Sequence, residues 1–445
     1  MYSTRQGTEL ASERLNFLSK KQRAVSSRAS RQIIPCSNGQ TFNLSQTARL
    51  DISGNQHATF WDPQNSYLKF TVKNNDTAAV RLESAYSLID RIELLADGTT
   101  ISDIQHYNCL MHSYLDSEVG TNFKDHFGRS LFGTSFNADE LETIAAGGSS
   151  TYCLCLPFLP VFSASKYIPL GGRSTLSYRI TFASAATGLV GAATNTEIVI
   201  SPVEMICSYI RLNEQANAMV IEHTGGIFDI IASDVRAAEG NVSTGDTVLA
   251  LNAGFSFSSL DRVSWGIYPT LNTALGLSVS NRAASTLQGF ALSINGEEFP
   301  RTRIRVSQSN VSETVAEIAV ASRSLGDFNH QSSLQRYEIT PTDSTTPCVF
   351  TDKFYLPNPS GLPSTDAFDY ETNRGTYLAM IDTESMKPHA DSEALFSGIS
   401  TLGSVVQLVG TFTSVPANAT VIAFAQYTLS MRLDLNGSQT WVVSI

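Results

Sequence analysis

The chain has 445 residues, of which 42% are hydrophobic and only 16% are charged, and its formal net charge is −11. This length suits two or three domains, the low charged fraction argues against a helical bundle, and the abundant large apolar residues argue against disorder. An acidic body is also a poor surface for nucleic acid. Plentiful Ser, Thr, Asn and Gly are typical of many short strands joined by polar turns.

Residues 1–35 differ from the rest of the chain in charge. This segment carries +5 and the remaining 410 residues carry −16. Its basic side chains are Arg5, Arg14, Lys20, Lys21, Arg23, Arg28 and Arg31. Leu10, Phe17 and Ala24 add a weak apolar stripe at seven-residue spacing. The pattern predicts an interaction arm and leaves three roles open: a tail ordered by neighbouring subunits, a helix on a membrane surface, or a nucleic-acid arm.

The first half of the chain alternates apolar and polar residues, which predicts strands. The expected strands are 67–72, 89–95, 152–156, 174–183 and 197–212. Ile104, Tyr107 and Tyr114 fall at helical spacing and predict a short helix over 104–115. Residues 120–150 are expected to be a long loop.

The second half repeats this plan. Its expected strands are 255–257, 262–268, 290–294, 299–306, 348–356, 375–381, 405–412 and 421–435, with a helix that begins at Ser312. Asp97-Gly98 and Asn295-Gly296 are strong hairpin turns 198 residues apart, and each is followed by a strand and then a helix. The segments 209–212 and 430–433 are similar closing strands. The chain is therefore predicted to contain two related β-sandwiches.

The sequence offers no catalytic chemistry, so the protein is predicted not to be an enzyme and to bind no cofactor or metal. Nucleophile-elbow, phosphate-loop, zinc-protease and dinucleotide motifs are missing. His106, His112 and His126 are spaced by six and fourteen residues, which fits no standard zinc pattern. The six cysteines form no CxxC pair and are expected to be small buried hydrophobes.

Arg301, Arg303 and Arg305 occupy alternate positions of an expected strand, so one face of that strand should be basic. Such a strip can contact the acids of a neighbouring subunit, or it can be a solvated edge strand whose charges prevent stray pairing. Nucleic acid is a weaker candidate partner because the body is acidic.

Several segments resemble the first jelly roll of double jelly-roll major capsid proteins from polinton-like viruses, adintoviruses, virophages and related tailless icosahedral DNA viruses. The resemblance is carried by FWDPQNSYLKF (60–70), SAYSLIDRI (84–92), the Asp97-Gly98 turn and ISDIQHYN (101–108). Residues 427–445 resemble the last strand of these proteins. The pattern is clear over residues 40–115 and weak elsewhere.

The resemblance implies an all-β fold of two tandem eight-stranded jelly-roll β-sandwiches, with short helices in the connecting loops. The expected division is an arm (1–35), an N-terminal jelly roll (36–215) and a C-terminal jelly roll (216–445). Homotrimers would form pseudo-hexameric capsomers of an icosahedral virion, in contact with neighbouring capsomers, penton proteins and minor capsid proteins. The arm would face an internal membrane or the genome, and loops 120–150 and 357–375 would face outward.

Two alternatives stay open at this stage. One is the coat protein of a small virus, with a single shell jelly roll and a β-rich projecting domain. The other is a non-viral β-sandwich binding module or glycan-active enzyme, although no signal peptide is visible. The internal repeat argues against the first alternative, and the missing catalytic site argues against the second.

Overall fold

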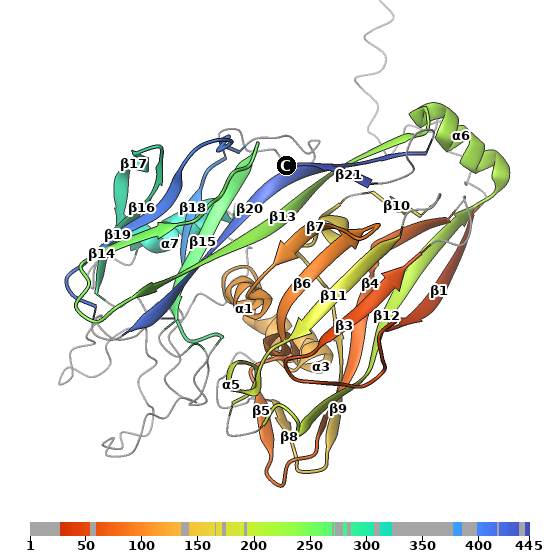
Figure 1. The fold of residues 1–445 in the computed structure, drawn as a ribbon, viewed down its shortest axis with the longest axis horizontal. Helices are drawn as coiled ribbons and strands as arrows, with labels where there is room; N and C mark the ends of the chain where they lie inside the picture. Colours follow the sequence, from red (N-terminus) through yellow and green to blue (C-terminus); the bar gives the residue numbers. More distant parts are fainter. Residues whose placement is uncertain are drawn as a thin grey trace, which may run out of the picture.

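The computed structural model describes residues 27–53, 59–134, 142–164, 166–170, 175–190, 194–268, 271, 279–282, 286–306, 312–322, 377–384, 398–415, 418–435 and 441–445. In these residues the chain forms two β-sandwiches that lie side by side, with helix α1 (Tyr107–Ser117) between them (Figure 1). Both sandwiches are jelly rolls, so the predicted fold class is confirmed.

The first jelly roll packs two sheets face to face. One sheet has the order β1-β12-β4-β10, with β2 added to β12 and β9 added to β4, and the other has the order β3-β11-β6-β7. The strands are β1 (Ser27–Pro35), β2 (Phe42–Asn43), β3 (Thr47–Ile52), β4 (Thr59–Asn74), β6 (Ile89–Ala96), β7 (Thr99–Ile104), β9 (Ser149–Leu154), β10 (Ile168–Pro169), β11 (Leu176–Phe182) and β12 (Ile198–Leu212). A separate ribbon pairs β5 (Val80–Leu82) with β8 (Glu142–Ile144).

The second jelly roll repeats the strand order of the first. Its sheets are β13-β20-β15-β18, with β21 added to β20, and β14-β19-β16-β17. The strands are β13 (Ile227–Val242), β14 (Val248–Asn252), β15 (Leu260–Tyr268), β16 (Leu287–Ile294), β17 (Glu297–Arg305), β18 (Ala379–Asp382), β19 (Val406–Phe412), β20 (Ala419–Asp434) and β21 (Trp441–Ser444). A projecting domain of different architecture is therefore excluded, because both halves share one topology.

The two predicted hairpin turns join equivalent strands. Asp97 and Gly98 connect β6 to β7, and Asn295 and Gly296 connect β16 to β17. All four residues have positive φ, between 51° and 87°. This is the backbone of the type I′ turn, whose twist matches that of the flanking strands. Local sequence therefore sets the same hairpin in both halves.

One tryptophan anchors each sandwich. Trp61 on β4 packs edge-on against Tyr178 on β11, with ring centroids 6.2 Å apart, and Trp265 on β15 packs edge-on against Phe290 on β16 at 5.2 Å. Both tryptophans are fully buried. Each pair joins the two sheets of its own jelly roll, which is the packing that holds a sandwich together.

Short helices fill the connections, as predicted. Besides α1 they are η2 (Ala85–Leu88), α2 (Thr121–Phe123), η3 (Lys124–Gly128), α3 (Arg129–Phe132), α4 (Pro160–Ser163), α5 (Ala185–Gly188), α6 (Glu214–Thr224) and α7 (Ser312–Ala321). The expectation of a long loop over 120–150 was wrong, because α2, η3, α3, β8 and part of β9 lie there. Residues 255–257 form no strand, although Phe255 and Phe257 are buried. Residues 348–356 and 357–375 lie outside the described residues.

The predicted arm, residues 1–35, contains β1. This strand pairs antiparallel with β12 along its whole length, from Ser27 opposite Leu212 to Pro35 opposite Glu204. The sequence signal for β1 is weak because eight of its nine residues are exposed. The structure thus assigns residues 27–35 to the first sheet.

Replacing the turn glycines tests the repeated hairpin. A Cβ at Gly98 or Gly296 would meet no atom within 4 Å, so the cost of substitution is backbone strain alone. We expect Gly98→Val and Gly296→Val each to lower the free energy of unfolding by about 1–2 kcal/mol, measured by urea denaturation. Thr99→Val, at an exposed strand position next to the turn, is the control and should be neutral. Equal stability of a glycine variant and the wild type would contradict the turn assignment.

Candidate functional site

The described residues concentrate their buried polar chemistry where the two jelly rolls meet. Helix α1 lies at the centre of this contact, and ten of its eleven residues are buried. A helix that is buried on all sides must satisfy its polar groups within the protein. Ser113 and Ser117 do so by donating to the backbone carbonyls of Cys109 and Ser113, each at 2.9 Å.

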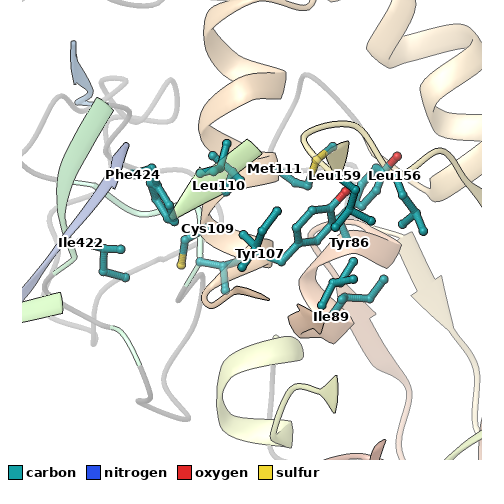
Figure 2. Close-up of a cluster of buried hydrophobic side chains, with 14 of the residues drawn as sticks. Tyr86, Ile89, Tyr107, Cys109, Leu110, Met111, Leu156, Leu159, Ile422 and Phe424 are labelled. Carbon is teal, nitrogen blue, oxygen red and sulfur yellow. The ribbon is translucent and has the colours of Figure 1, made fainter. Parts of the chain in front are cut away.

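The apolar side chains of α1 contact both sandwiches. Figure 2 shows Tyr107, Cys109, Leu110 and Met111 between two groups of residues. On one side lie Tyr86, Ile89, Leu156 and Leu159 of the first jelly roll, and on the other lie Ile422 and Phe424 on β20 of the second. The hydrophobic core is therefore continuous from one jelly roll to the other through α1.

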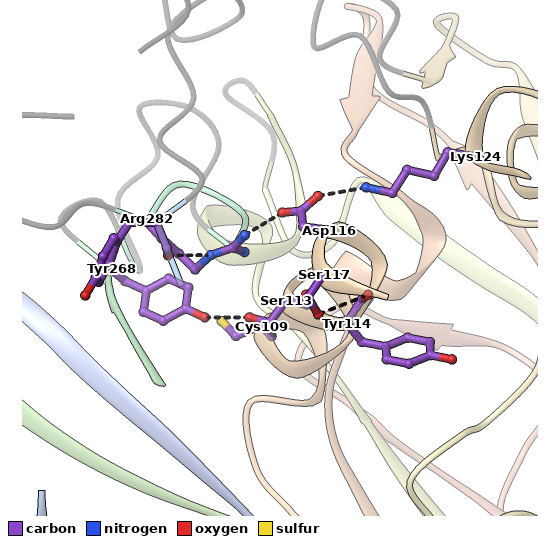
Figure 3. A network of polar contacts seen from close by, with 9 residues as sticks. Cys109, Ser113, Tyr114, Asp116, Ser117, Lys124, Tyr268 and Arg282 are labelled. Atoms are coloured by element: carbon purple, nitrogen blue, oxygen red, sulfur yellow. Dashed lines mark hydrogen bonds and ion pairs between the residues drawn. The ribbon is translucent and has the colours of Figure 1, made fainter. Parts of the chain in front are cut away.

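A charged network closes the same contact (Figure 3). The carboxylate of Asp116 accepts a hydrogen bond from Nζ of Lys124 at 2.8 Å and another from Nη2 of Arg282 at 2.5 Å. Arg282 belongs to the second jelly roll, is fully buried, and also donates from Nε to the carbonyl of Tyr377 at 3.0 Å. Asp116 thus joins the two jelly rolls through a buried, charge-assisted pair.

A second ion pair lies at the rim of the contact. Nη1 of Arg262 on β15 lies 2.6 Å from Oε1 of Glu118, which directly follows α1, and Nε of Arg262 donates to Oε1 of Gln426 at 2.7 Å. These side chains line a small cleft between the jelly rolls together with Tyr114 and Phe158. Because its polar groups already pair with one another, the cleft is part of the contact between the domains.

The edge strands β7 and β13 meet through side chains. Ser102 on β7 donates to Oδ1 of Asp234 on β13 at 2.7 Å. Nearby, Oγ of Ser163 in α4 donates to the backbone carbonyl of Ser233 at 2.7 Å and accepts from its backbone N–H at 2.8 Å. These contacts satisfy part of the open edge of β13, which would otherwise expose unpaired backbone groups.

Asp234 is a carboxyl at this contact whose pKa is raised by its surroundings. It is fully buried, and this burial raises its pKa to about 7, although hydrogen bonds from Ser102, Tyr427 and the Val235 backbone act in the opposite direction. Asp103 raises it further by charge repulsion. A carboxyl whose desolvation exceeds the stabilisation of its charged form holds its proton near neutral pH.

The predicted basic residues fall into three groups. Arg28 and Arg31 lie on β1, where Arg31 stacks over the ring of Tyr67 at 6.0 Å. Arg301, Arg303 and Arg305 lie on β17, an edge strand, where Arg303 forms a bidentate ion pair with Glu298 and the other two are exposed. Arg5, Arg14, Lys20, Lys21 and Arg23 lie outside the described residues. The structure does not bring the β1 and β17 groups together within one chain.

The histidines and cysteines singled out in the sequence lie in different surroundings and do not form one site. His112 is buried against Ser84 at 3.0 Å, and His106 lies 3.1 Å from Glu239 across the contact between the jelly rolls. Cys36, Cys109 and Cys207 are buried as expected, but Cys155 is exposed and Cys153 is half-buried.

Within the described segments, no group of three or more metal-ligating side chains is arranged around a common point. No helix among them has the length and apolarity needed to cross a membrane.

Sequence reasoning missed the residues that join the two domains. Asp116 and Lys124 are separated from Arg282 by more than 150 positions, and no local pattern marks an ion pair between them. The one available signal was the composition of 107–117, in which Ser113, Asp116 and Ser117 share a helical segment with large apolar residues.

Comparisons with known proteins identify the fold. No protein-family model matches the sequence, and no curated protein matches it. Among solved structures, the chain is similar to the PBCV-1 virus capsid (TM-score 0.61, 11% identity, covering 96% of this chain and 99% of the other). It is also similar to the Faustovirus major capsid protein (0.56, 8%, 93% and 91%) and to a chain of the Sputnik virophage (0.54, 10%, 98% and 92%). The likeness extends over nearly the whole chain and shows that the fold, with both jelly rolls, is shared.

Removing the central carboxylate should destabilise the contact between the domains. In an Asp116→Ala variant the ammonium of Lys124 and the guanidinium of Arg282 would remain buried without their shared anion. We expect a loss of about 3–5 kcal/mol in the free energy of unfolding, measured by urea denaturation. Glu222→Ala, which removes an exposed carboxylate from α6 away from this contact, is the matched control. Similar stability of the two variants would show that Asp116 does not hold the jelly rolls together.

The raised pKa of Asp234 predicts a pH-dependent stability. Between the ordinary Asp pKa of 3.8 and about 7 the folded protein keeps a proton that the unfolded chain has released, so stability falls as pH rises through this window and then levels off. We expect the stability of the wild type relative to Asp234→Asn to fall by about 2 kcal/mol from pH 5 to pH 7 in urea titrations. A difference that is independent of pH would contradict this assignment.

Proposed function

We propose that this protein is the major capsid protein of a virus, a structural and non-catalytic subunit that builds an icosahedral shell. Its fold is shared along nearly its whole length with the PBCV-1 virus capsid and the Faustovirus major capsid protein. The observation that carries the proposal is the side-by-side contact of two domains with one topology. A contact between similar units can be repeated between copies, which is what a shell requires.

The proposed contact between copies is patterned on the contact between the edge strands within one chain. Within the chain, edge strand β7 of the first jelly roll meets edge strand β13 of the second. By their positions in the sheets, β17 is the counterpart of β7, and β1 is the counterpart of β13. In the described part of the chain β1 pairs only with β12, and β17 pairs only with β16. One copy therefore leaves β17, the counterpart of β7, and β1, the counterpart of β13, as edge strands that another copy could approach.

We place β17 of one subunit against β1 of the next. Three subunits joined in this way close a ring of six jelly rolls, a pseudo-hexameric homotrimer. β1 carries two arginines and β17 carries three, so the basic side chains of the two strands would not attract each other. Arg301 and Arg305 would instead face acids on the surrounding body, which carries −16 outside residues 1–35.

The remaining partners follow from this role. Capsomers would contact neighbouring capsomers, penton proteins and minor capsid proteins in the virion. The basic residues at the N-terminus would face the interior, where an internal membrane or the genome offers negative charge. No cofactor is needed for any of these contacts.

The oligomeric state tests the proposal. The chain has a mass of 48.2 kDa, so we expect a particle of about 145 kDa by light scattering, with six lobes in negative-stain micrographs. A monomer at micromolar concentration, or a particle without pseudo-sixfold shape, would contradict the proposed function.

Charge reversal on β17 tests the contact itself. Arg301→Glu with Arg305→Glu should shift trimers toward monomers by placing two acids against an acidic body. Lys73→Glu with Lys166→Glu makes the same change in net charge at exposed positions elsewhere and should leave the trimer intact. Trimers that are equally stable in both variants would move the subunit contact away from β17.

A further inference from the structure

Helix α7 takes the place in the second jelly roll that α1 takes in the first, because each follows the second strand of its β-hairpin. Within the chain, α1 covers the outer face of the β13-β20-β15 sheet, where its Leu110 and Tyr114 line the same cleft as Val235 and Phe424. The first jelly roll has an equivalent sheet face on β1, β12 and β4. Figure 1 shows this face far from α7 of the same chain.

Two buried tyrosines fix the correspondence between the strands of the two sheets. Tyr209 on β12 and Tyr427 on β20 are 3% and 4% exposed, and they lie opposite Ser30 and Asp234 respectively. Ser30 therefore corresponds to Asp234, and each residue of β1 corresponds to the β13 residue that lies 204 positions later in the chain.

The correspondence extends across three strands. Ile33, Ile206 and Tyr67 form one row of the first sheet, because Ile206 lies opposite both of the others. The corresponding row of the second sheet is Ala237, Phe424 and Ser264. Both rows lie on the outer faces of their sheets, so the two surfaces can be compared position by position.

The two faces differ in how they are covered. In the second sheet Phe424 and Ser264 are 2% and 9% exposed beneath α1. In the first sheet Ile33 is 60% exposed, and the exposed Arg31 stacks over the ring of Tyr67 at 6.0 Å. An apolar side chain on an open edge strand, at a position that a helix covers in the other jelly roll, indicates a surface for a second helix.

Helix α7 has a face that suits this surface. Thr314, Ile318 and Ala321 are buried and form the side that faces its own jelly roll. The opposite side, at the spacing of one helix face, consists of Glu313, Ala316, Glu317 and Val320, and none of these is fully buried. Two carboxylates beside small apolar side chains complement a strand that presents an arginine and an isoleucine.

The contact within the chain also gives the direction of the helix. His106, just before α1, lies 3.1 Å from Glu239 on β13, and Glu118, just after α1, pairs with Arg262 on β15. By the correspondence above, Glu239 matches Pro35. A helix placed on the first sheet in the same way begins near Pro35 and runs toward β4.

We propose that α7 of one copy lies across β1 of the next copy in this orientation. Ala316 packs against Ile33 and Glu317 pairs with Arg31. The contact is head-to-tail, since each copy supplies β1 from its first jelly roll and α7 from its second, and such a contact can close a ring. This inference rests on the proposed trimer and names the surface through which a second copy binds.

Charge reversal at this pair tests the contact in the full-length protein. Arg31→Glu should raise the concentration at which half of the trimers dissociate about tenfold, because like charges then face each other, and Glu317→Arg should do the same. The double variant should return toward the wild-type value. Lys166→Glu changes an exposed cation beside β10, at the opposite edge of the sheet, and should leave it unchanged. Analytical ultracentrifugation measures each midpoint.

An apolar position gives an independent measurement. Ile33→Asp should raise the same midpoint about tenfold, because a carboxylate would be desolvated at the contact. Val248→Asp is the matched control, since Val248 is 61% exposed on β14, at the opposite edge of its sheet from β17. An unchanged near-ultraviolet circular dichroism spectrum shows that each variant is folded.

The outcomes separate this inference from the proposed function. A wild-type protein that forms no trimer would overturn both. Trimers of wild-type strength in Arg31→Glu or Ile33→Asp, or a double variant that dissociates as readily as the single variants, would overturn the placement of α7 and leave the trimer standing.

Discussion

The buried pair between Asp116 and Arg282 is the interaction on which the arrangement of the two jelly rolls depends. Both side chains are almost completely excluded from solvent, and Lys124 shares the same carboxylate. Separating the domains would leave these charges partly unpaired in a low-dielectric surrounding, which is far more costly than losing an exposed pair. Such a pair also has strict geometry, so it favours one orientation of the second jelly roll on the first.

That orientation decides which sheet edges remain available. With α1 held between the sandwiches, β7 lies against β13, and the contact is made by side chains such as Ser102 and Asp234. The counterpart edges, β17 and β1, stay open and carry arginines and mostly exposed residues. Charged, exposed edges resist indiscriminate strand pairing. The exposed charges on these two edges therefore protect the chain against aggregation through its backbone.

The contact between the domains also combines two kinds of stabilisation. The apolar residues of α1 make the core continuous from Tyr86 to Phe424, which supplies most of the favourable burial. The polar groups around it fix the relative orientation of the domains, because each hydrogen bond or ion pair forms in only one arrangement of the two jelly rolls. The polar contact made by Asp234 depends on pH, because burial of this carboxyl opposes its ionisation.

Much of the β structure could be predicted because it is locally encoded. Strands 67–72, 89–95 and 405–412 show the alternation that a half-buried strand requires, and they lie in β4, β6 and β19. The residues around 120–150 were misread because α2, η3 and α3 are short and irregular and lack a sustained helical period. β13 was not predicted because its middle, from Ser233 to Gly240, mixes small and charged residues and does not alternate regularly between apolar and polar side chains.

The sequence alone determined the all-β class, the duplication and the two type I′ hairpins. These features rest on short-range chemistry: period-two alternation, and the tolerance of Asp, Asn and Gly for positive φ. Only the tertiary structure decided that β1 extends into the predicted arm, that α1 lies between the sandwiches, and that Asp116 meets Arg282. Those facts depend on contacts between residues far apart in the chain, and such contacts leave no periodic signal in a single sequence.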